Sequence, residues 1–266
     1  MSEHSTVQAV VNAQRMQLLC RQYAAVYLNQ LESSDEGGSE SRQVYCWVLG
    51  VLSDGQPEAI GLWSHDAAGW KSPGHVLKNI KSRGVERIRF VMGGGGPAFG
   101  QDLRASFPGA TALPSFALQF EVSVSRATQD HRALMALLLQ DIIEAGSPQE
   151  ASQALGHLES SPLGERYPDV VAAWRHTLEQ GRPLFDAAPP LRRVVHSGDS
   201  LATALNRSLG RAIARRRPFT SADDAVAFIR AALERRLRAI GVSDRGAVTA
   251  RSRTRTALAS TMSASL

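Results

Sequence analysis

The sequence predicts an α/β fold, in which a mixed five-stranded sheet with helices is joined to a helical insertion and C-terminal helices. Two patterns support this prediction. Segments of strand type alternate with segments of helix type through the first half of the chain, and after about residue 128 only helical periodicity remains. The chain has 266 residues, of which 43% are hydrophobic, and this is enough to bury a sizeable core.

The first half reads as one helix followed by elements in the order β-β-β-α-β-α-β. Apolar residues at helical spacing predict the first helix over 5–22. A Gly/Ser-rich segment at 33–41 and a Ser-Asp-Gly turn at 53–55 separate the first three strands and predict that these strands are antiparallel. The strands are expected at 23–31, 43–52, 58–64, 87–92 and within 110–124, and the helices at 72–83 and 99–106.

The second half is predicted to be helical. Helices are expected at 131–145, 148–159, 167–180, 199–216 and 221–240, with a proline-broken connection at 186–194. Ser221 is the expected N-cap of the last helix, and Gly241 is its expected stop. Residues 242–266 are rich in Ser, Thr, Ala and Arg, and this composition predicts a disordered tail.

Composition excludes several classes of protein. No run of 18 apolar residues occurs, which argues against a membrane span, and no basic-then-apolar leader precedes the first helix. Two cysteines are too few for a disulfide framework or a four-cysteine zinc site. The seven histidines show no metal-ligand spacing, so we expect no metal. These features predict a cytoplasmic protein with reduced thiols.

Positive charge is concentrated in the last quarter of the chain. Residues 1–196 carry a net charge of −3, residues 197–241 carry +5, and residues 242–266 carry +3. Of the 30 basic residues 27 are arginine, whose guanidinium makes forked contacts to phosphate. Arg207, Arg211 and Arg215 are spaced to share one helical face, and Arg216 and Arg217 follow them. This pattern favours a nucleic-acid partner that is contacted through its phosphate backbone; the alternative is a solvated helix face.

Three antiparallel strands followed by helix, strand, helix and strand is the element order of the ribonuclease-H-like core. The residues extend this likeness. The stretch VYCWVLGVLSDGQPEAIGLWSHDAAGWKSPGHVLKNIKSRG at 44–84 closely resembles the catalytic domain of bacterial mutator-family DDE transposases. The resemblance continues through VERIRF, YPDVVAAWR, LNRSLGR and PFTSADDAV and covers about residues 5–241. It implies the following organisation: an N-terminal helix at 1–22, a ribonuclease-H-like core at 23–128, a helical insertion at 129–196, basic helices completing the core at 197–241, and the tail at 242–266.

The chemistry of this family uses three carboxylates that hold two divalent metal ions during DNA strand cleavage and transfer. At the corresponding positions this chain has Asn29, Gly94, and either Ala202 or Thr203. None of these side chains replaces a carboxylate as a ligand for Mg²⁺ or Mn²⁺. The Cys-x-x-His pair of the family is also absent, since Ser115 and Leu118 take its place. The resemblance therefore implies a transposase-derived protein that binds DNA or other proteins without catalysis and needs no cofactor.

Alternative functions remain open at this point. An active transposase could use displaced carboxylates, for which the candidates are Asp35, Asp54, Asp102 and Asp199. The protein could instead join a full-length transposase and modulate it, or be an unselected remnant. Because the resemblance begins at the catalytic domain, we expect no N-terminal region that recognises transposon ends. It also implies a homodimer or heteromer that works on nucleoid DNA, away from membranes.

Overall fold

The computed structural model describes residues 19–34, 42–66, 73–93, 96–216 and 219–240. The predicted tail at 242–266 and residues 5–18 of the predicted first helix lie outside these ranges. Residues 19–22, which the same prediction included, are not helical, and the first strand begins at Gln22.

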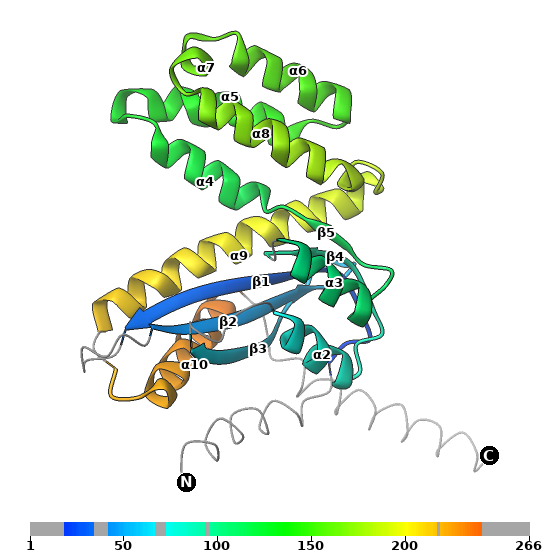
Figure 1. The fold of residues 1–266 in the computed structure, drawn as a ribbon, viewed down its shortest axis with the longest axis vertical. Coiled ribbons are helices and arrows are strands. Elements are labelled where there is room, and N and C mark those ends of the chain that lie inside the picture. Colours follow the sequence, from blue (N-terminus) through cyan, green and yellow to red (C-terminus); the bar gives the residue numbers. More distant parts are fainter. Residues whose placement is uncertain (1–18, 35–41, 67–72, 94–95, 217–218, 241–266) are drawn as a thin grey trace, which may run out of the picture.

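A five-stranded mixed sheet forms the centre of the molecule, as predicted (Figure 1). Its order is β3-β2-β1-β4-β5. Strands β1 to β3 are antiparallel, whereas β4 is parallel to β1 and β5 is parallel to β4. The Gly55 backbone has φ +85°, which suits the tight turn between β2 and β3. The bounds are β1 Gln22–Ser34, β2 Arg42–Val51, β3 Pro57–Asp66, β4 Arg87–Met92 and β5 Thr111–Leu113.

Side chains alternate between the two faces of the sheet, so each face has its own apolar core. On β1, Val26 and Leu28 point to one face and pack with helices α2 (Gly74–Ser82) and α3 (Gly96–Ser106). Tyr27 and Leu31 point to the other face, together with Trp47 of β2. That face is covered by α4 (Phe116–Arg126), α9 (Pro189–Arg216) and α10 (Ala222–Ala239).

A body of helices lies at one end of the long axis of the molecule (Figure 1). It consists of α5 Arg132–Glu144, α6 Pro148–Glu159, α7 Pro162–Arg166 and α8 Pro168–Gly181, with short 3₁₀ turns at Gln129–His131 and Arg182–Leu184. Trp174 of α8 is fully buried, and its indole nitrogen donates to Ser123 Oγ of α4. This contact ties the helical body to the layer that covers the sheet.

One element prediction was wrong, and one helix was missed. The connection at 186–194 is largely helical, because α9 begins at Pro189; prolines are tolerated in the first turn, where the backbone N–H needs no helical acceptor. The fifth strand lies within 110–124 as predicted, but it is only three residues long, and the helix α4, which was not predicted, follows it. Ser115 is the N-cap of α4 and accepts a hydrogen bond from the Leu118 backbone nitrogen, a start signal that the sequence contained.

Candidate functional site

Of the positions where the resemblance predicts carboxylates, one lies on β1 and another follows the end of the neighbouring parallel strand β4 in the sequence. Asn29 lies on β1, half-buried, on the face that α9 covers, and its amide donates to Tyr27 O at 3.3 Å. The last residue pair in the β1–β4 register is Tyr27 with Met92. Asn29 and Gly94 each come two residues after this pair in the sequence. Gly94 itself lies outside the described residues.

Gly93 shows how closely the chain leaving β4 approaches β1. Its φ is +91°, and a Cβ atom at this position would overlap the carbonyl oxygen of Leu28. Only glycine meets both conditions. The strand end is therefore held against β1 immediately beside Asn29.

One row of residues on α9 faces β1. The Tyr27 hydroxyl donates to Val195 O at 2.6 Å, and Gly198 lies against the Tyr27 ring, where no Cβ would fit. Two turns further on, the Asn206 amide donates to Gln30 O at 3.3 Å. Ala202 lies one turn from each of Gly198 and Asn206 on the same row and is 2% exposed. This row runs alongside Tyr27 to Gln30, so Ala202 is turned toward the strand segment that holds Asn29.

The adjacent row of α9 faces α4 instead. Asp199 accepts hydrogen bonds from Ser115 Oγ at 2.6 Å and from the Ala117 backbone nitrogen at 2.8 Å. Two turns later, Arg207 forms an ion pair with Glu121 of α4 at 2.7 Å. Thr203 lies between Asp199 and Arg207 on this row. Of the two sequence candidates, Ala202 is thus the one directed at β1, and Thr203 is directed at α4.

A buried indole on β2 forms a hydrogen bond to α9. Trp47 pairs with Asn29 in the β1–β2 register and is completely buried on the same face of the sheet. Its Nε1 donates to Asn206 Oδ1 at 2.8 Å. The side chains on this side of the sheet are the amides of Asn29 and Asn206, the methyl group of Ala202 and the indole of Trp47. This donor set provides no anionic oxygen, which is the ligand that Mg²⁺ and Mn²⁺ require.

Asp199 is a buried carboxyl group of α9 that accepts hydrogen bonds from the start of α4. Burial raises its pKa from 3.8 to about 6, although the hydrogen bonds from Ala117 and Ser115 act in the opposite direction. Burial and the neighbouring Asp199 raise the pKa of the Tyr27 hydroxyl. Sequence reasoning gave Asp199 only as a displaced carboxylate and missed that it holds the first turn of α4. The Ser115 N-cap was the available signal.

The other candidate carboxylates do not gather around Asp199. The Asp102 carboxylate lies against Gly74, on the opposite face of the sheet. Asp54 accepts from the Gln56 nitrogen in the β2–β3 turn, and Asp35 is not among the described residues. In the described ranges, no three His, Cys, Asp or Glu side chains lie close enough to share a metal ion.

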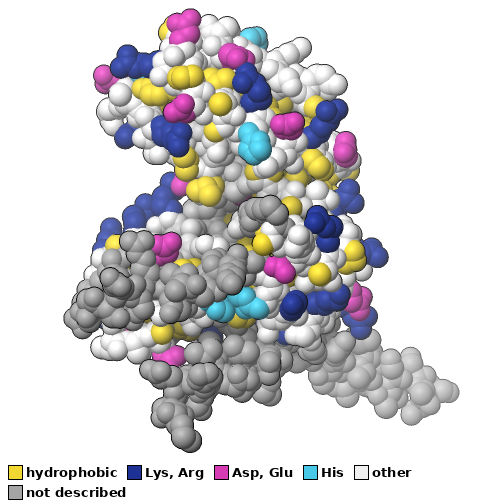
Figure 2. Space-filling view, viewed as in Figure 1, with side chains coloured by type: hydrophobic (Ala, Val, Ile, Leu, Met, Phe, Trp, Pro, Cys, Tyr) yellow, Lys and Arg dark blue, Asp and Glu magenta, His cyan; other side chains and the backbone are white. Residues whose placement is uncertain are grey.

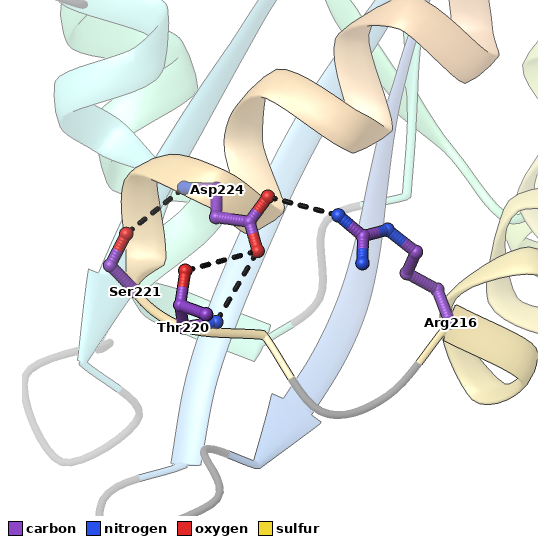
Figure 3. Close-up of polar contacts among 4 residues, drawn as sticks. All are labelled: Arg216, Thr220, Ser221 and Asp224. Atoms are coloured by element: carbon purple, nitrogen blue, oxygen red, sulfur yellow. Dashed lines mark hydrogen bonds and ion pairs between the residues drawn. The ribbon is translucent and has the colours of Figure 1, made fainter.

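The arginines predicted to contact DNA divide into two groups. Arg207, Arg211 and Arg215 are all exposed on α9. Of these three, Arg207 forms an ion pair with Glu121. Arg216 forms an ion pair with Asp224 at 3.2 Å (Figure 3), and Arg217 lies outside the described residues.

Asp224 links the end of α9 to the start of α10. It accepts hydrogen bonds from the Thr220 nitrogen and hydroxyl at 3.3 Å, and its own backbone nitrogen donates to Ser221 Oγ (Figure 3). Ser221 is therefore the N-cap, as predicted. The Arg216 guanidinium also lies over the rings of Phe219 and Phe228, so this arginine is largely committed to holding the α9–α10 corner.

In the part of the chain that the structure describes, no helix is long and apolar enough to cross a membrane.

Comparison of the chain with known proteins identifies a family. Residues 2–237 match the family model described as "Transposase, Mutator family".

Three relatives illustrate the match. The chain is 28% identical over 185 residues to a transposase for insertion sequence element ISRM3 of Rhizobium meliloti (strain 1021), and 29% identical over 185 residues to a probable ISRM3-like transposase of Sinorhizobium fredii (strain NBRC 101917 / NGR234). Each match covers 70% of this chain and 46% of the relative. A probable transposase of Corynebacterium diphtheriae is 25% identical over 198 residues, 74% of this chain and 57% of that protein. The chain thus spans about half the length of these curated relatives.

Proposed function

Because the chain belongs to the mutator family of transposases, we propose that it is a transposase-derived protein that binds DNA without cutting it. The sheet order β3-β2-β1-β4-β5, with a long helix over β1, supports a ribonuclease-H-like core. In that core the catalytic centre would lie between Asn29 of β1, Ala202 of α9 and the end of β4.

The lack of anionic ligands at this centre is the observation that carries the proposal. Ala202 rather than a glutamate is turned toward the strand segment that holds Asn29, and the neighbouring Trp47 is fully buried on the same face of the sheet, where it is hydrogen-bonded to Asn206. Bringing two divalent cations here would require anionic oxygen ligands, which these side chains do not supply. The residues present therefore do not fit the metal pair that strand transfer uses.

The same helix supplies the surface for DNA. Arg211 and Arg215 are exposed, without acidic partners among the described residues, and Arg207 shares their side of α9. Contacts of this kind go to phosphates, so binding would tolerate many sequences and weaken steeply with salt. We place this binding on nucleoid DNA in the cytoplasm.

A nicking assay tests the catalytic half of the proposal. Supercoiled plasmid is incubated with the full chain in Mg²⁺ and, separately, in Mn²⁺, and conversion to open circle is followed. We expect no conversion above a protein-free control. The double variant Asn29→Asp/Gly94→Asp should be equally inactive, because Ala202 still lacks a carboxylate. Metal-dependent nicking that is lost in Asp199→Ala or Asp102→Ala would contradict the proposal and favour displaced carboxylates.

A further inference from the structure

The junction between α9 and α10 holds a half-buried arginine, Arg236, that forms no ion pair with any described residue. Its Nε donates to Ser208 Oγ of α9 at 2.8 Å. Its terminal nitrogens donate to main-chain oxygens, Nη1 to Ala232 O at 2.9 Å and Nη2 to Ser208 O at 3.4 Å. These contacts fix the guanidinium plane between the two helices. Because a guanidinium has five N–H donors, one N–H remains on each terminal nitrogen for a further acceptor.

Two exposed arginines lie near this guanidinium and form with it the α9–α10 arginine cluster. Arg211 follows Ser208 by three residues, so the two share one side of α9, and Arg235 precedes Arg236 on α10. Burial lowers the pKa of Arg236, and the charges of Arg235 and Arg211 lower it further. The cluster therefore brings three like charges together, and among the described residues none of the three has a carboxylate partner.

Other arginines of α9 are neutralised by the fold itself. Arg207 has Glu121 at 2.7 Å, and Arg216 has Asp224 at 3.2 Å. The α9–α10 arginine cluster lacks such a carboxylate, although Ser208 holds its central guanidinium in place. Guanidinium groups that are held in position and reached from solvent bind phosphate oxygens through forked hydrogen bonds. Figure 2 shows basic side chains gathered along the edge of the molecule that α9 forms, on the left of the view.

We propose that the α9–α10 arginine cluster binds one phosphate group, and that this group belongs to the DNA backbone. The remaining N–H groups of Arg236 would donate to the phosphate oxygens, and Arg211 and Arg235 would approach the same group from their two helices. The source of the phosphate rests on the proposed DNA binding, whereas the site itself rests on the contacts of Arg236. The proposal extends the DNA-binding surface from α9 to α10 and gives it one fixed point among mobile side chains.

Inorganic phosphate is the first probe. Thermal unfolding of the full chain is followed in increasing sodium phosphate at neutral pH, with sodium chloride added to hold the ionic strength constant. We expect a saturable rise in the unfolding temperature over chloride alone, because a ligand that binds the folded state stabilises it. Arg211→Gln and Arg235→Gln should each weaken the apparent phosphate affinity about tenfold. Arg104→Gln is the matched control: it removes an exposed arginine of α3, on the opposite face of the sheet, and should leave this affinity unchanged.

Two further measurements separate the site from a general positive surface and identify the source of the phosphate. Ser208→Ala keeps all three arginines but removes the Oγ that accepts from Arg236 Nε, so phosphate should bind severalfold more weakly. A surface that acts through charge alone would not respond to this change. In anisotropy titrations of a labelled duplex, Arg235→Gln should weaken binding and reduce the log–log salt slope by about 1.

The outcomes distinguish a failure of this site from a failure of DNA binding. Phosphate that stabilises the chain no more than chloride does, or an equal loss of affinity in Arg104→Gln, would overturn the phosphate site even if the duplex binds. Duplex binding that Arg235→Gln leaves unchanged would show that the DNA does not use this site. Phosphate binding by an unmodified chain that binds no duplex would refute DNA as the source and, with it, the proposed function.

Discussion

Replacing Asp199 by asparagine should stabilise the protein at neutral pH. Burial raises the pKa of this carboxyl from 3.8 to about 6, so the folded state binds the proton more tightly than the unfolded state does. The contribution of Asp199 therefore favours folding most at low pH and is lost as the pH rises from about 4 through 6. The difference between 3.8 and about 6 corresponds to a loss of about 3 kcal/mol in the free energy of unfolding. Asparagine avoids this loss, since its oxygen can accept from Ala117 N and its amide can donate to Ser115 Oγ.

The assay is denaturant unfolding of both proteins between pH 4.5 and 7.5. We expect Asp199→Asn to gain up to about 3 kcal/mol over the unmodified chain at pH 7.5, and the gain to shrink toward pH 4.5. The difference between the two curves isolates Asp199 from other titrating groups. Asp169→Asn, which removes an exposed carboxylate, is the control and should give no comparable gain. Two parallel curves, or a less stable Asp199→Asn at pH 7.5, would refute the account of Asp199 as a destabilised buried acid.

Three further predictions concern the site and its surroundings. Trp47→Phe should lower the free energy of unfolding by about 1–3 kcal/mol, because Asn206 Oδ1 loses its buried donor. Trp47→Ala should lower it by about 3–5 kcal/mol. Unfolding curves that match the unmodified chain would show that this contact does not stabilise the packing of α9. Gly84→Ala should cost about 1–2 kcal/mol for its φ of +98° alone, and Gly93→Ala should cost more, because its Cβ also meets the Leu28 carbonyl; equal losses in thermal or denaturant unfolding would contradict the close approach of β4 to β1. Burial raises the pKa of the Cys46 thiol to about 12, so a disulfide reagent should modify Cys46 only as fast as the protein unfolds, and rapid labelling of Cys46 by mass spectrometry would count against this packing.

Much of the fold could be predicted from the sequence. The first three strands are marked by strong turn signals, and the hydrophobic spacing of Val76, Leu77 and Ile80 defined α2. The start of α9 could not be predicted in the same way, since Pro189 and Pro190 indicate a break as readily as a first turn. The α4 helix was missed because its apolar residues also suit a strand, although Ser115 carried the capping signal.

The candidate site depended on contacts between residues far apart in the sequence. Residue type alone showed that Asn29 and Ala202 lack carboxylates. The sequence could not distinguish Ala202 from Thr203, because the choice depends on which row of α9 faces β1, and this is fixed by Tyr27 and Asn206. Nor could it show that Arg216 is held by Asp224, since the two residues are joined by the turn between α9 and α10. The exposed Arg211 and Arg215 remain the predicted DNA contacts.

Fluorescence anisotropy of a labelled DNA duplex, titrated with the full chain at several salt concentrations, measures whether this protein binds DNA and how the binding depends on salt. We expect micromolar or tighter binding at low salt that falls steeply as salt rises. Arg211→Glu/Arg215→Glu should weaken binding on every duplex sequence and reduce the log–log salt slope by about 2, one for each lost phosphate contact. Arg166→Glu/Arg182→Glu is the control: it makes the same charge change in the helical body, outside α9, and should leave the salt slope unchanged. Absence of binding at low salt, or an unchanged slope in the α9 variant, would contradict DNA binding through this helix.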